Sequence, residues 1–451
     1  MQIIVAGCGK VGITLVEQLS KEGHDIIVID KDANKIKRVS TMYDVQGVAG
    51  TSISLNILKE AGIERADIFI AVTNQDELNL LSCLIAKKAG NVHTIAKIKN
   101  PIYSKESEFL KRELGLSLVI NQEFAAAAEI AKLLRFPSAS QIDTFAKGRI
   151  ELLKFRVISE SILCGLQVMD IAPKLHCDIL ICSIERGEEV IIPSGVCELQ
   201  EKDVVSIVAT PKESLQFFRK IGIATSRAKN TMIVGGGEIA YYLSNILLHM
   251  GVKVTLIERD VERCEELSEL LPKARIICGD GADREILSEE GLSSVESFVA
   301  LTDFDEENVL LTLYAKSQMK GKQITKITSS SYDKIINSMD LDSVIYPKNI
   351  TAEYILQYVR AMQNSIGSNI ETLYRLCDNK VEALEFHIQE GAPVIGKPLE
   401  ELKLKDNLLI CSISHENKTQ IPRGHDTIAE GDTVVVVTSH AGLKDIGDIL
   451  K

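Results

Sequence analysis

The chain has 451 residues, of which 45% are hydrophobic and 25% charged, and its net charge is −12 at neutral pH. This composition is typical of globular domains, and at roughly 150 residues a domain the length suggests about three. The acidic balance argues against a nucleic-acid partner, because phosphate contacts need clustered Lys and Arg. The sequence contains no apolar run of the ~18–20 residues that span a bilayer, and no basic-then-apolar leader. We therefore expect a soluble cytoplasmic protein that meets the membrane only through a partner.

Residues 1–140 alternate between strand and helix patterns. Val11, Leu15 and Leu19 recur at four-residue spacing, and the segment Ala125–Leu134 is rich in Ala and Leu, so both are expected in helices. Continuous apolar runs of this length are typical of parallel strands that are covered on both faces. The runs are Ile3–Ala6, Ile26–Ile29, Val45–Val48, Ile68–Val72, Thr94–Ile98 and Leu118–Ile120. The alternation predicts a doubly wound, Rossmann-like α/β domain.

Residues 141–224 have a different pattern, in which short strands are separated by turn signals such as Arg186-Gly187 and one helix, Pro211–Ile221, closes the segment. This pattern predicts a small α+β domain. The boundary is expected near Pro137-Ser138-Ala139-Ser140, where a proline disfavours helix. The predicted strands are Leu152–Val157, Ile179–Ile184, Val190–Ile192 and Val204–Val208.

The whole pattern then recurs at an offset of about 228 residues. Ile3–Gly9 returns as Thr231–Gly237, and Ile192-Pro193-Ser194-Gly195 returns as Ile421-Pro422-Arg423-Gly424. An offset held over so long a stretch indicates a tandem duplication. We expect a second nucleotide-type domain over 230–366 and a second small domain over 367–451, joined to the first pair by the polar stretch Ala224–Asn230.

A glycine-rich turn follows the first predicted strand and opens a helix. Its first glycine permits a tight turn, its second lets the backbone approach a phosphate, and its third allows close packing of helix on strand. Asp30 ends the second strand, where its carboxylate can accept hydrogen bonds from ribose hydroxyls. We expect pyrophosphate binding at Gly7, Cys8, Gly9, Lys10, Val11 and Gly12. The alternative is a glycine turn that only packs.

The second copy repeats this turn, with Glu258 in the position of Asp30. Glu238 replaces Lys10, and a carboxylate inside a phosphate-facing turn can repel a diphosphate. We therefore expect the two sites to differ in affinity or ligand. The second candidate site consists of Gly235, Gly236, Gly237, Glu238, Ile239 and Glu258.

Further candidates lie at the ends of the fourth and fifth strands. Thr73 and Asn74, with Thr302 in the second copy, are placed to touch ribose or phosphate, or to cap the next helix. Lys97, which matches Lys326, is either a phosphate contact or a surface lysine. Ten cysteines without a Cys-x-x-Cys pair are expected to be small buried hydrophobic residues, and the eight scattered histidines suggest no metal site.

At these residues the chain resembles the TrkA family of potassium-uptake regulators and, more broadly, RCK (KTN) domains, over nearly its whole length. The resemblance implies a peripheral subunit, without enzyme activity, that binds NAD(H) and possibly ATP or ADP. It also implies a homo-oligomeric ring, dimer or tetramer, on the inner face of the membrane beneath a Trk-type potassium transporter. Helices 124–134 and 350–363 are candidate dimer or hinge elements, or ordinary sheet-covering helices. The motifs are Gly7–Gly12, Asp30, Leu58–Ile63, Ala71–Glu77 and Ile95–Ile98.

The main alternative is an NAD-dependent oxidoreductase, because fold alone does not decide function. Such an enzyme needs an acid–base residue and usually a cation that orients substrate. Between the two small domains, the position of His176 corresponds to that of Lys405, and the position of Arg186 corresponds to that of His415. No Ser, His, Lys and Asp constellation is matched between the copies, so the sequence favours a regulator.

Overall fold

A computed structural model describes residues 1–135, 141–145, 149–158, 161–187, 189–222, 228–329, 333–339, 341–364, 370–377, 380–415, 418–440, 442–443 and 445–451. The stretch 137–140, where a domain boundary is expected, lies outside these residues, as do residues 224, 366 and 367 at the other expected boundaries. The chain forms two compact units. One contains Met1–Ala131 and Ala228–Val359, and the other contains Lys132–Arg227 and Arg360–Lys451.

The first unit contains two parallel six-stranded sheets. The first sheet has the order β3-β2-β1-β4-β5-β6. The strands up to β3 lie on one side of β1 and those from β4 on lie on its other side, so the strand order reverses between β1 and β4. In such sheets ligands bind beyond the carboxyl ends of the strands at this reversal. The strands are β1 (Gln2–Ala6), β2 (Asp25–Asp30), β3 (Gln46–Ala49), β4 (Ile68–Ala71), β5 (His93–Ile98) and β6 (Leu118–Asn121). Each predicted strand of this domain is confirmed to within two residues at either end.

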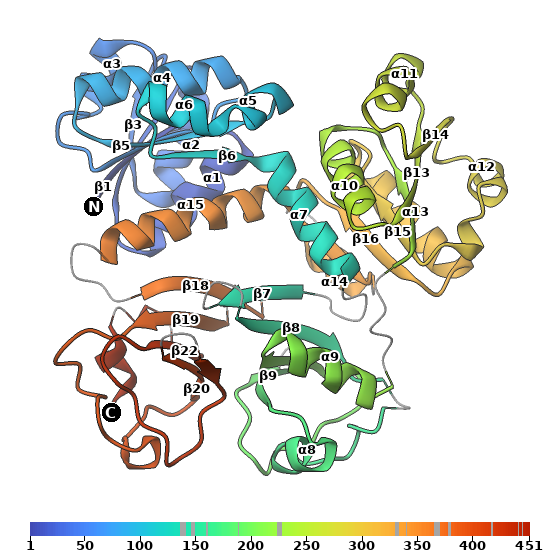
Figure 1. The fold of residues 1–451 in the computed structure, drawn as a ribbon. Coiled ribbons are helices and arrows are strands. Elements are labelled where there is room, and N and C mark those ends of the chain that lie inside the picture. The colour runs from blue at the N-terminus through green and yellow to red at the C-terminus, as the bar shows by residue number, and fades with distance from the viewer. Residues whose placement is uncertain are drawn as a thin grey trace. The chain divides into compact units, whose positions relative to one another are not determined.

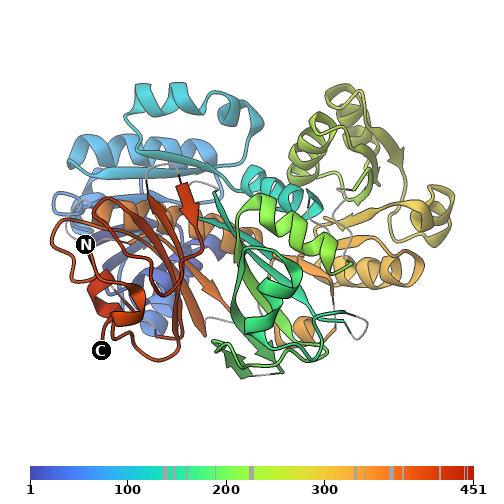
Figure 2. The ribbon, with the colours of Figure 1, turned by 60° about the horizontal axis from the view of Figure 1, so that its bottom comes forward.

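Helices cover both faces of this sheet (Figures 1 and 2). On one face the buried Leu58 and Cys83 pack against Ile4 and Phe69 of the central strands. On the other, Leu15 and Leu19 point inward from α1 at the spacing of one helical turn. The helices are α1 (Lys10–Lys21), α2 (Ala33–Tyr43), α3 (Leu55–Glu60), α4 (Asp76–Ala89), α5 (Pro101–Lys105), α6 (Ser107–Leu114) and α7 (Gln122–Arg135).

The second sheet repeats the first with the order β14-β13-β12-β15-β16-β17. Its strands are β12 (Asn230–Val234), β13 (Lys253–Glu258), β14 (Arg275–Cys278), β15 (Ser297–Ala300), β16 (Lys322–Lys326) and β17 (Ser343–Ile345). Its helical elements are α10 (Glu238–His249), α11 (Val261–Leu270), α12 (Arg284–Glu289), η2 (Leu292–Ser294), α13 (Asp305–Gln318), α14 (Asp333–Ser338) and α15 (Pro347–Asn364). The duplicated α/β fold expected from the sequence is confirmed.

The last helix of each nucleotide-type domain contacts the other domain. Asn121, just before α7, donates its side-chain N–H to the Tyr242 hydroxyl of α10 at 3.0 Å, and the Phe124 ring meets the Tyr242 ring edge-on at 5.6 Å. In return Tyr358 of α15 lies 3.5 Å from Nδ1 of His93 on β5. These helices therefore link the two domains of the first unit.

The second unit contains two antiparallel five-stranded sheets, ordered β10-β9-β11-β8-β7 and β18-β19-β22-β20-β21. They share an apolar cluster in which Phe145 of one sheet packs edge-on against Tyr374 of the other at 5.0 Å. The first half comprises β7 (Gln141–Phe145), β8 (Ile150–Arg156), α8 (Val168–Leu175), β9 (Ile179–Arg186), β10 (Glu189–Ile191), β11 (Val204–Ala209) and α9 (Pro211–Lys220). The second comprises β18 (Ile370–Leu376), β19 (Val381–His387), η3 (Leu399–Glu401), β20 (Leu408–His415), β21 (Lys418–Gln420), β22 (Thr433–Thr438) and η4 (Ile446–Ile449).

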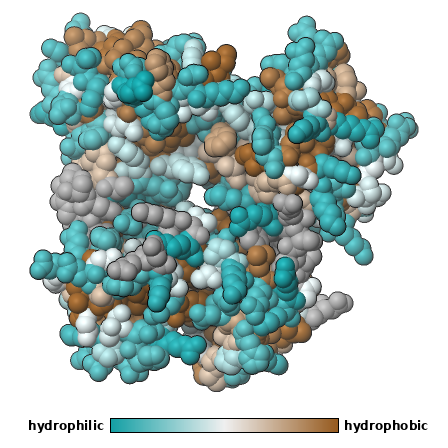
Figure 3. Space-filling model, in the orientation of Figure 1, coloured by the Kyte–Doolittle hydropathy of each residue, from teal (hydrophilic) through white to brown (hydrophobic). Residues whose placement is uncertain are grey.

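The surface is mixed in polarity. Figure 3 shows hydrophilic side chains over every part of the face drawn, with apolar ones between them. Within the described residues, no helix combines the length and apolar content that a membrane span requires. The expectation that every cysteine is buried is wrong for Cys164 and Cys278, which are exposed, and Cys278 lies on β14, at the edge of its sheet.

Candidate functional site

The first glycine-rich turn joins β1 to α1. Gly7 has φ +109°, and a Cβ there would lie 2.9 Å from the backbone N of Thr73. A Cβ on Gly12 would lie 1.8 Å from the Gly7 carbonyl oxygen, so this glycine is required for packing. Around Gly9, by contrast, a Cβ would meet nothing within 4 Å, and Gly9 provides no side-chain cap for α1. The turn thus presents the start of α1 to open space, the arrangement that suits an anion.

Asp30 holds this turn in place from the neighbouring strand. Its Oδ2 accepts a hydrogen bond from the backbone N of Cys8 at 2.7 Å, and its Oδ1 accepts one from the backbone N of Asp32 at 2.9 Å. A carboxylate oxygen can accept more than one hydrogen bond, so Asp30 can still receive ribose hydroxyls. The Cys8 side chain is buried, and burial and then the negative charge of Asp30 raise the pKa of its thiol to about 12.

The other first-copy candidates are divided between backbone and side-chain roles. Lys10 and Asn74 are exposed at the carboxyl end of the sheet. Val11 is buried, so only its backbone N–H is available to a ligand. Thr73 donates its hydroxyl to Oδ1 of Asn79 at 2.6 Å, which orders the turn before α4.

Asn79 is a site residue that sequence reasoning missed. It is fully buried, accepts from the backbone N of Thr73 at 2.9 Å and donates to the Lys97 carbonyl at 2.8 Å. Asn308 makes the same pair of bonds in the second copy, to Thr302 and Lys326. The offset of 229 residues between the two asparagines was the available signal.

Lys97 is buried with 4% of its surface exposed, so the alternative of a surface lysine is wrong. Burial, and next the charge of Lys99, lower the pKa of Lys97 to about 8, against the opposing effects of Glu123 and Asp76. Glu123 begins α7, was not singled out from the sequence, and has a buried Oε2 with no hydrogen-bond partner among the described residues. Its own pKa is raised, first by burial.

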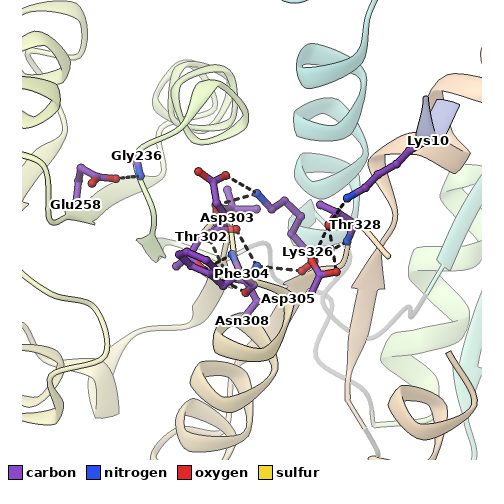
Figure 4. Close-up of polar contacts among 11 residues, drawn as sticks. Lys10, Gly236, Glu258, Thr302, Asp303, Phe304, Asp305, Asn308, Lys326 and Thr328 are labelled. Atoms are coloured by element: carbon purple, nitrogen blue, oxygen red, sulfur yellow. Dashed lines mark hydrogen bonds and ion pairs between the residues drawn. The ribbon is translucent and has the colours of Figure 1, made fainter. Parts of the chain in front are cut away.

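The second turn reproduces the first. Gly235 has φ +98°, and a Cβ there would lie 2.8 Å from the backbone of Leu301 and Thr302. Oε2 of Glu258 accepts from the backbone N of Gly236 at 2.6 Å (Figure 4), and its Oε1 accepts from the backbone N of Asp260 at 2.9 Å. A glutamate on β13 therefore performs the task of Asp30 on β2.

Three further second-copy residues differ in their surroundings. Glu238 is paired with Arg263, 3.1 Å away, and Arg263 also donates to the Gly236 carbonyl. Ile239 is buried and offers only its backbone. Lys326 donates to the Leu301 carbonyl at 3.2 Å and lies 3.7 Å from Asp303; burial lowers its pKa.

A cavity of about 230 Å³ opens beside the second turn. This is below the ~300–1,000 Å³ of whole ligand pockets, so it fits part of a nucleotide. The lining residues are Val234, Gly235, Gly236, Gly237, Ile257, Glu258, Arg259, Asp260, Asp280, Gly281, Leu301, Thr302, Asp303, Phe304 and Glu307.

Lys10 of the first candidate site contacts the second nucleotide-type domain. Its ammonium donates to the Thr328 hydroxyl at 3.0 Å, and Asp305 accepts from the backbone N–H of Thr328 and of Ser329, both at 2.8 Å (Figure 4). Thr328 follows β16, whose last residue is Lys326. Lys10 of the first glycine turn thus reaches the segment that directly follows β16, the strand that ends at the buried Lys326.

Doubly wound parallel sheets with a glycine turn beside a strand-end carboxylate define the class of Rossmann-like α/β domains, here present in two copies. The family model of the TrkA-N domain matches residues 3–122 and 231–347, and that of the TrkA-C domain matches residues 152–222 and 383–451. The chain belongs to the TrkA family of Trk system potassium uptake proteins.

Curated relatives match over their full length. The chain is 33% identical over 451 residues to the Trk system potassium uptake protein TrkA homolog of Archaeoglobus fulgidus, covering 100% of both chains. It is 30% identical over 440 residues to TrkA of Vibrio alginolyticus, covering 97% of this chain and 95% of that one.

Solved structures share the fold. The GsuK channel bound to NAD has a TM-score of 0.62 at 16% identity, over 97% of this chain and 76% of that one. The crystal structure of GsuK bound to ADP has a TM-score of 0.51 at 14% identity, over 81% of this chain and 69% of that one.

Proposed function

We propose that this chain is a cytoplasmic, peripheral regulatory subunit of a Trk-type membrane potassium transporter, and that it binds NAD(H), ATP or ADP at the two glycine-rich turns. The observation that carries the proposal is the duplicated arrangement of turn and carboxylate. In both copies an acid at the end of the second strand accepts a hydrogen bond from the backbone of the turn, at 2.7 and 2.6 Å. The full-length TrkA relatives and the NAD- and ADP-bound channel structures supply the transport context and the ligand class.

In the first site the residues present fit a nucleotide. The free N–H groups at the start of α1 face the pyrophosphate, Asp30 accepts the ribose hydroxyls, and the ammonium of Lys97 approaches phosphate from β5. Lys97 has a depressed pKa, and a neighbouring phosphate would favour its charged form again. In the second site the same roles fall to the glycine turn, the strand-end acid and the buried lysine of that copy, which are Gly235, Gly236, Gly237, Glu258 and Lys326.

Regulation requires two states with different affinity for the nucleotide, because a ligand shifts an equilibrium only by its differential affinity. The contact of Lys10 with Thr328 supplies an element that can respond. A phosphate bound at the first turn competes with Thr328 for the Lys10 ammonium. Nucleotide binding therefore weakens this contact between the two domains, and nucleotide release allows it to form again. In a homo-oligomeric ring, dimer or tetramer, such a change is passed to the membrane partner.

Among the described residues of the small domains, the basic groups weighed for the oxidoreductase alternative are engaged in structural contacts. Arg186 pairs with Asp203 at 2.7 Å, and at the matching positions His415 pairs with Asp432 at 2.6 Å. Each basic side chain thus contacts a buried aspartate that directly precedes a strand of its own domain. The His176 backbone ends helix α8 in the left-handed region, and its carbonyl accepts from Lys220.

The proposal is tested with the purified full-length chain. Thermal unfolding should shift to higher temperature with NAD⁺, NADH, ADP or ATP, since a ligand bound only to the native state stabilises it. NADH absorbance should stay constant over hours in the presence of small oxidisable or reducible substrates. Steady NADH turnover would contradict the regulatory function. If the chain is purified from membranes with its bound proteins and no potassium transporter is among them, the proposed membrane partner is contradicted.

A further inference from the structure

The duplication provides an internal comparison of charge between the two nucleotide sites. The cavity at the second turn is lined by five carboxylates and one guanidinium, which are Glu258, Arg259, Asp260, Asp280, Asp303 and Glu307. The matching positions of the first copy hold two carboxylates and one ammonium, and they are Asp30, Lys31, Asp32, Thr51, Asn74 and Leu78. The formal charges of the two linings are therefore −4 and −1.

The phosphate-facing turns increase this difference. Glu238 of the second turn stands where Lys10 stands in the first, which brings the formal charges to −5 and 0. Arg263, which pairs with Glu238, does not alter the comparison, because Lys35 occupies its matching position. Lys97 and Lys326 likewise match each other. The second site thus carries about five more negative charges around the same backbone scaffold.

These acids are not hidden from a ligand. Asp280 and Asp303 are exposed, the Asp303 side chain to 98%, and its nearest cation, Lys326, is 3.7 Å away. Oδ1 of Asp280 accepts a hydrogen bond from the backbone N of Ala282 at 2.9 Å. Both carboxylates are therefore exposed to solvent, where they can repel phosphate oxygens that extend beyond the turn.

The second cavity also has an aromatic platform that the first copy lacks. The Arg259 guanidinium lies 5.9 Å from the centroid of the half-exposed Phe304 ring, and both line the cavity. Lys31 and Gln75 occupy these positions in the first copy. A flat side chain beside the ribose carboxylate favours a ligand that contributes ring stacking more than terminal charge.

We infer that the second site selects a dinucleotide of the NAD class and discriminates against ATP and ADP, whereas the first site accepts adenine nucleotides with terminal phosphates. This inference rests on the nucleotide binding proposed above. A terminal phosphate carries a charge of about −1.5 to −2 at neutral pH, while each bridging phosphate of a dinucleotide carries about one. Five charges at distances near the Debye length of about 8–10 Å shift a binding ratio by at least about tenfold.

Hydrogen–deuterium exchange of the full-length chain reads the two sites separately, because the peptides over Gly7–Gly12 and Gly235–Ala240 are distinct. The half-saturating concentrations of NAD⁺ and ATP are measured for protection of each turn. We expect the ATP-to-NAD⁺ ratio of these concentrations to be at least about tenfold higher at the second turn, and the difference to shrink as salt is raised.

The double variant Asp280→Thr/Asp303→Asn places the first-copy residues at two exposed positions. It should lower the half-saturating ATP concentration for protection of the second turn several-fold. Asn74→Asp is the matched control and should weaken ATP at the first turn only. Equal ratios at both turns, or a double variant without effect on ATP, would overturn the inference and leave the proposed binding intact. Protection at neither turn by any nucleotide would overturn the proposed binding, and this inference with it.

Discussion

Replacing Asp30 by alanine removes the acceptor of two backbone N–H groups together with the proposed ribose ligand. Hydrogen bonds to a charged group contribute about 1.5–3 kcal/mol each, so losing the ribose contact should raise the dissociation constant of the first site about 10- to 100-fold. The backbone N–H groups of Cys8 and Asp32, 2.7 and 2.9 Å from the carboxylate, also lose their partner. Because this region is only partly buried and water can replace the carboxylate, the expected loss of unfolding free energy is about 1 kcal/mol.

Two measurements separate these effects. Isothermal titration calorimetry with NAD⁺ gives affinity at each site, and thermal unfolding without nucleotide gives stability. Glu258→Ala is the matched control, since it should weaken only the second site, and Asp30→Asn should keep most of the stability while losing charge. An Asp30→Ala chain that binds with unchanged affinity at the first turn would refute the assignment of Asp30 to the ribose.

Three further predictions follow from the geometry of the first site. The Gly9→Ala variant should fold normally but bind nucleotide about tenfold or more weakly, because its Cβ enters the space left for phosphate. The Gly12→Ala variant should unfold at a temperature several degrees lower, since its Cβ would lie 1.8 Å from the carbonyl oxygen of Gly7. Equal melting temperatures of the two variants would contradict this difference. Nucleotide affinity at the first site should fall as pH rises through about 8, where Lys97 loses its proton, and Lys97→Met should remove this dependence in calorimetric titrations at pH 7 and 9. Asn79→Ala should cost about 1–3 kcal/mol in urea unfolding, because two buried backbone groups lose their partner, and a cost near zero would refute that role.

The same pKa shift makes folding stability depend on pH. The Lys97 pKa is lowered in the folded chain from 10.5 to about 8, so the unfolded chain binds more protons between these values. Stability from this group therefore rises as pH increases through that window. Binding and stability should thus change in opposite directions with pH.

The fold was predictable where local pattern and tertiary context agree. The continuous apolar runs in 1–140 predict the strands of a sheet covered on both faces, and Gly7, Gly12 and Gly235 mark turns whose steric limits follow from backbone geometry alone. The repeat then transfers this fold to the second copy, and its offset also fixes which residues correspond.

Other features depend on contacts that no local pattern contains. Lys97 lies on β5, between β4 and β6, with charged neighbours as far away in the sequence as Asp76 and Glu123, so spacing alone does not separate a buried lysine from a surface one. The contact of Lys10 with Thr328 joins residues 318 positions apart. Strand β7 lacks a regular alternation of buried residues, and helix α8 contains Pro173, a residue that disfavours helix. The described second small domain ends in the short η4 where the first has α9. The exposure of Cys278 follows from its place on an edge strand.

Calorimetric titration of the full-length chain with NAD⁺, NADH, ADP and ATP tests the central claim most directly. The structure predicts saturable heats from two sites, with the first weakened in Asp30→Ala and the second in Glu258→Ala. The absence of heat with all four nucleotides at millimolar concentration, from protein shown to be folded, would contradict the claim that these glycine turns bind nucleotides.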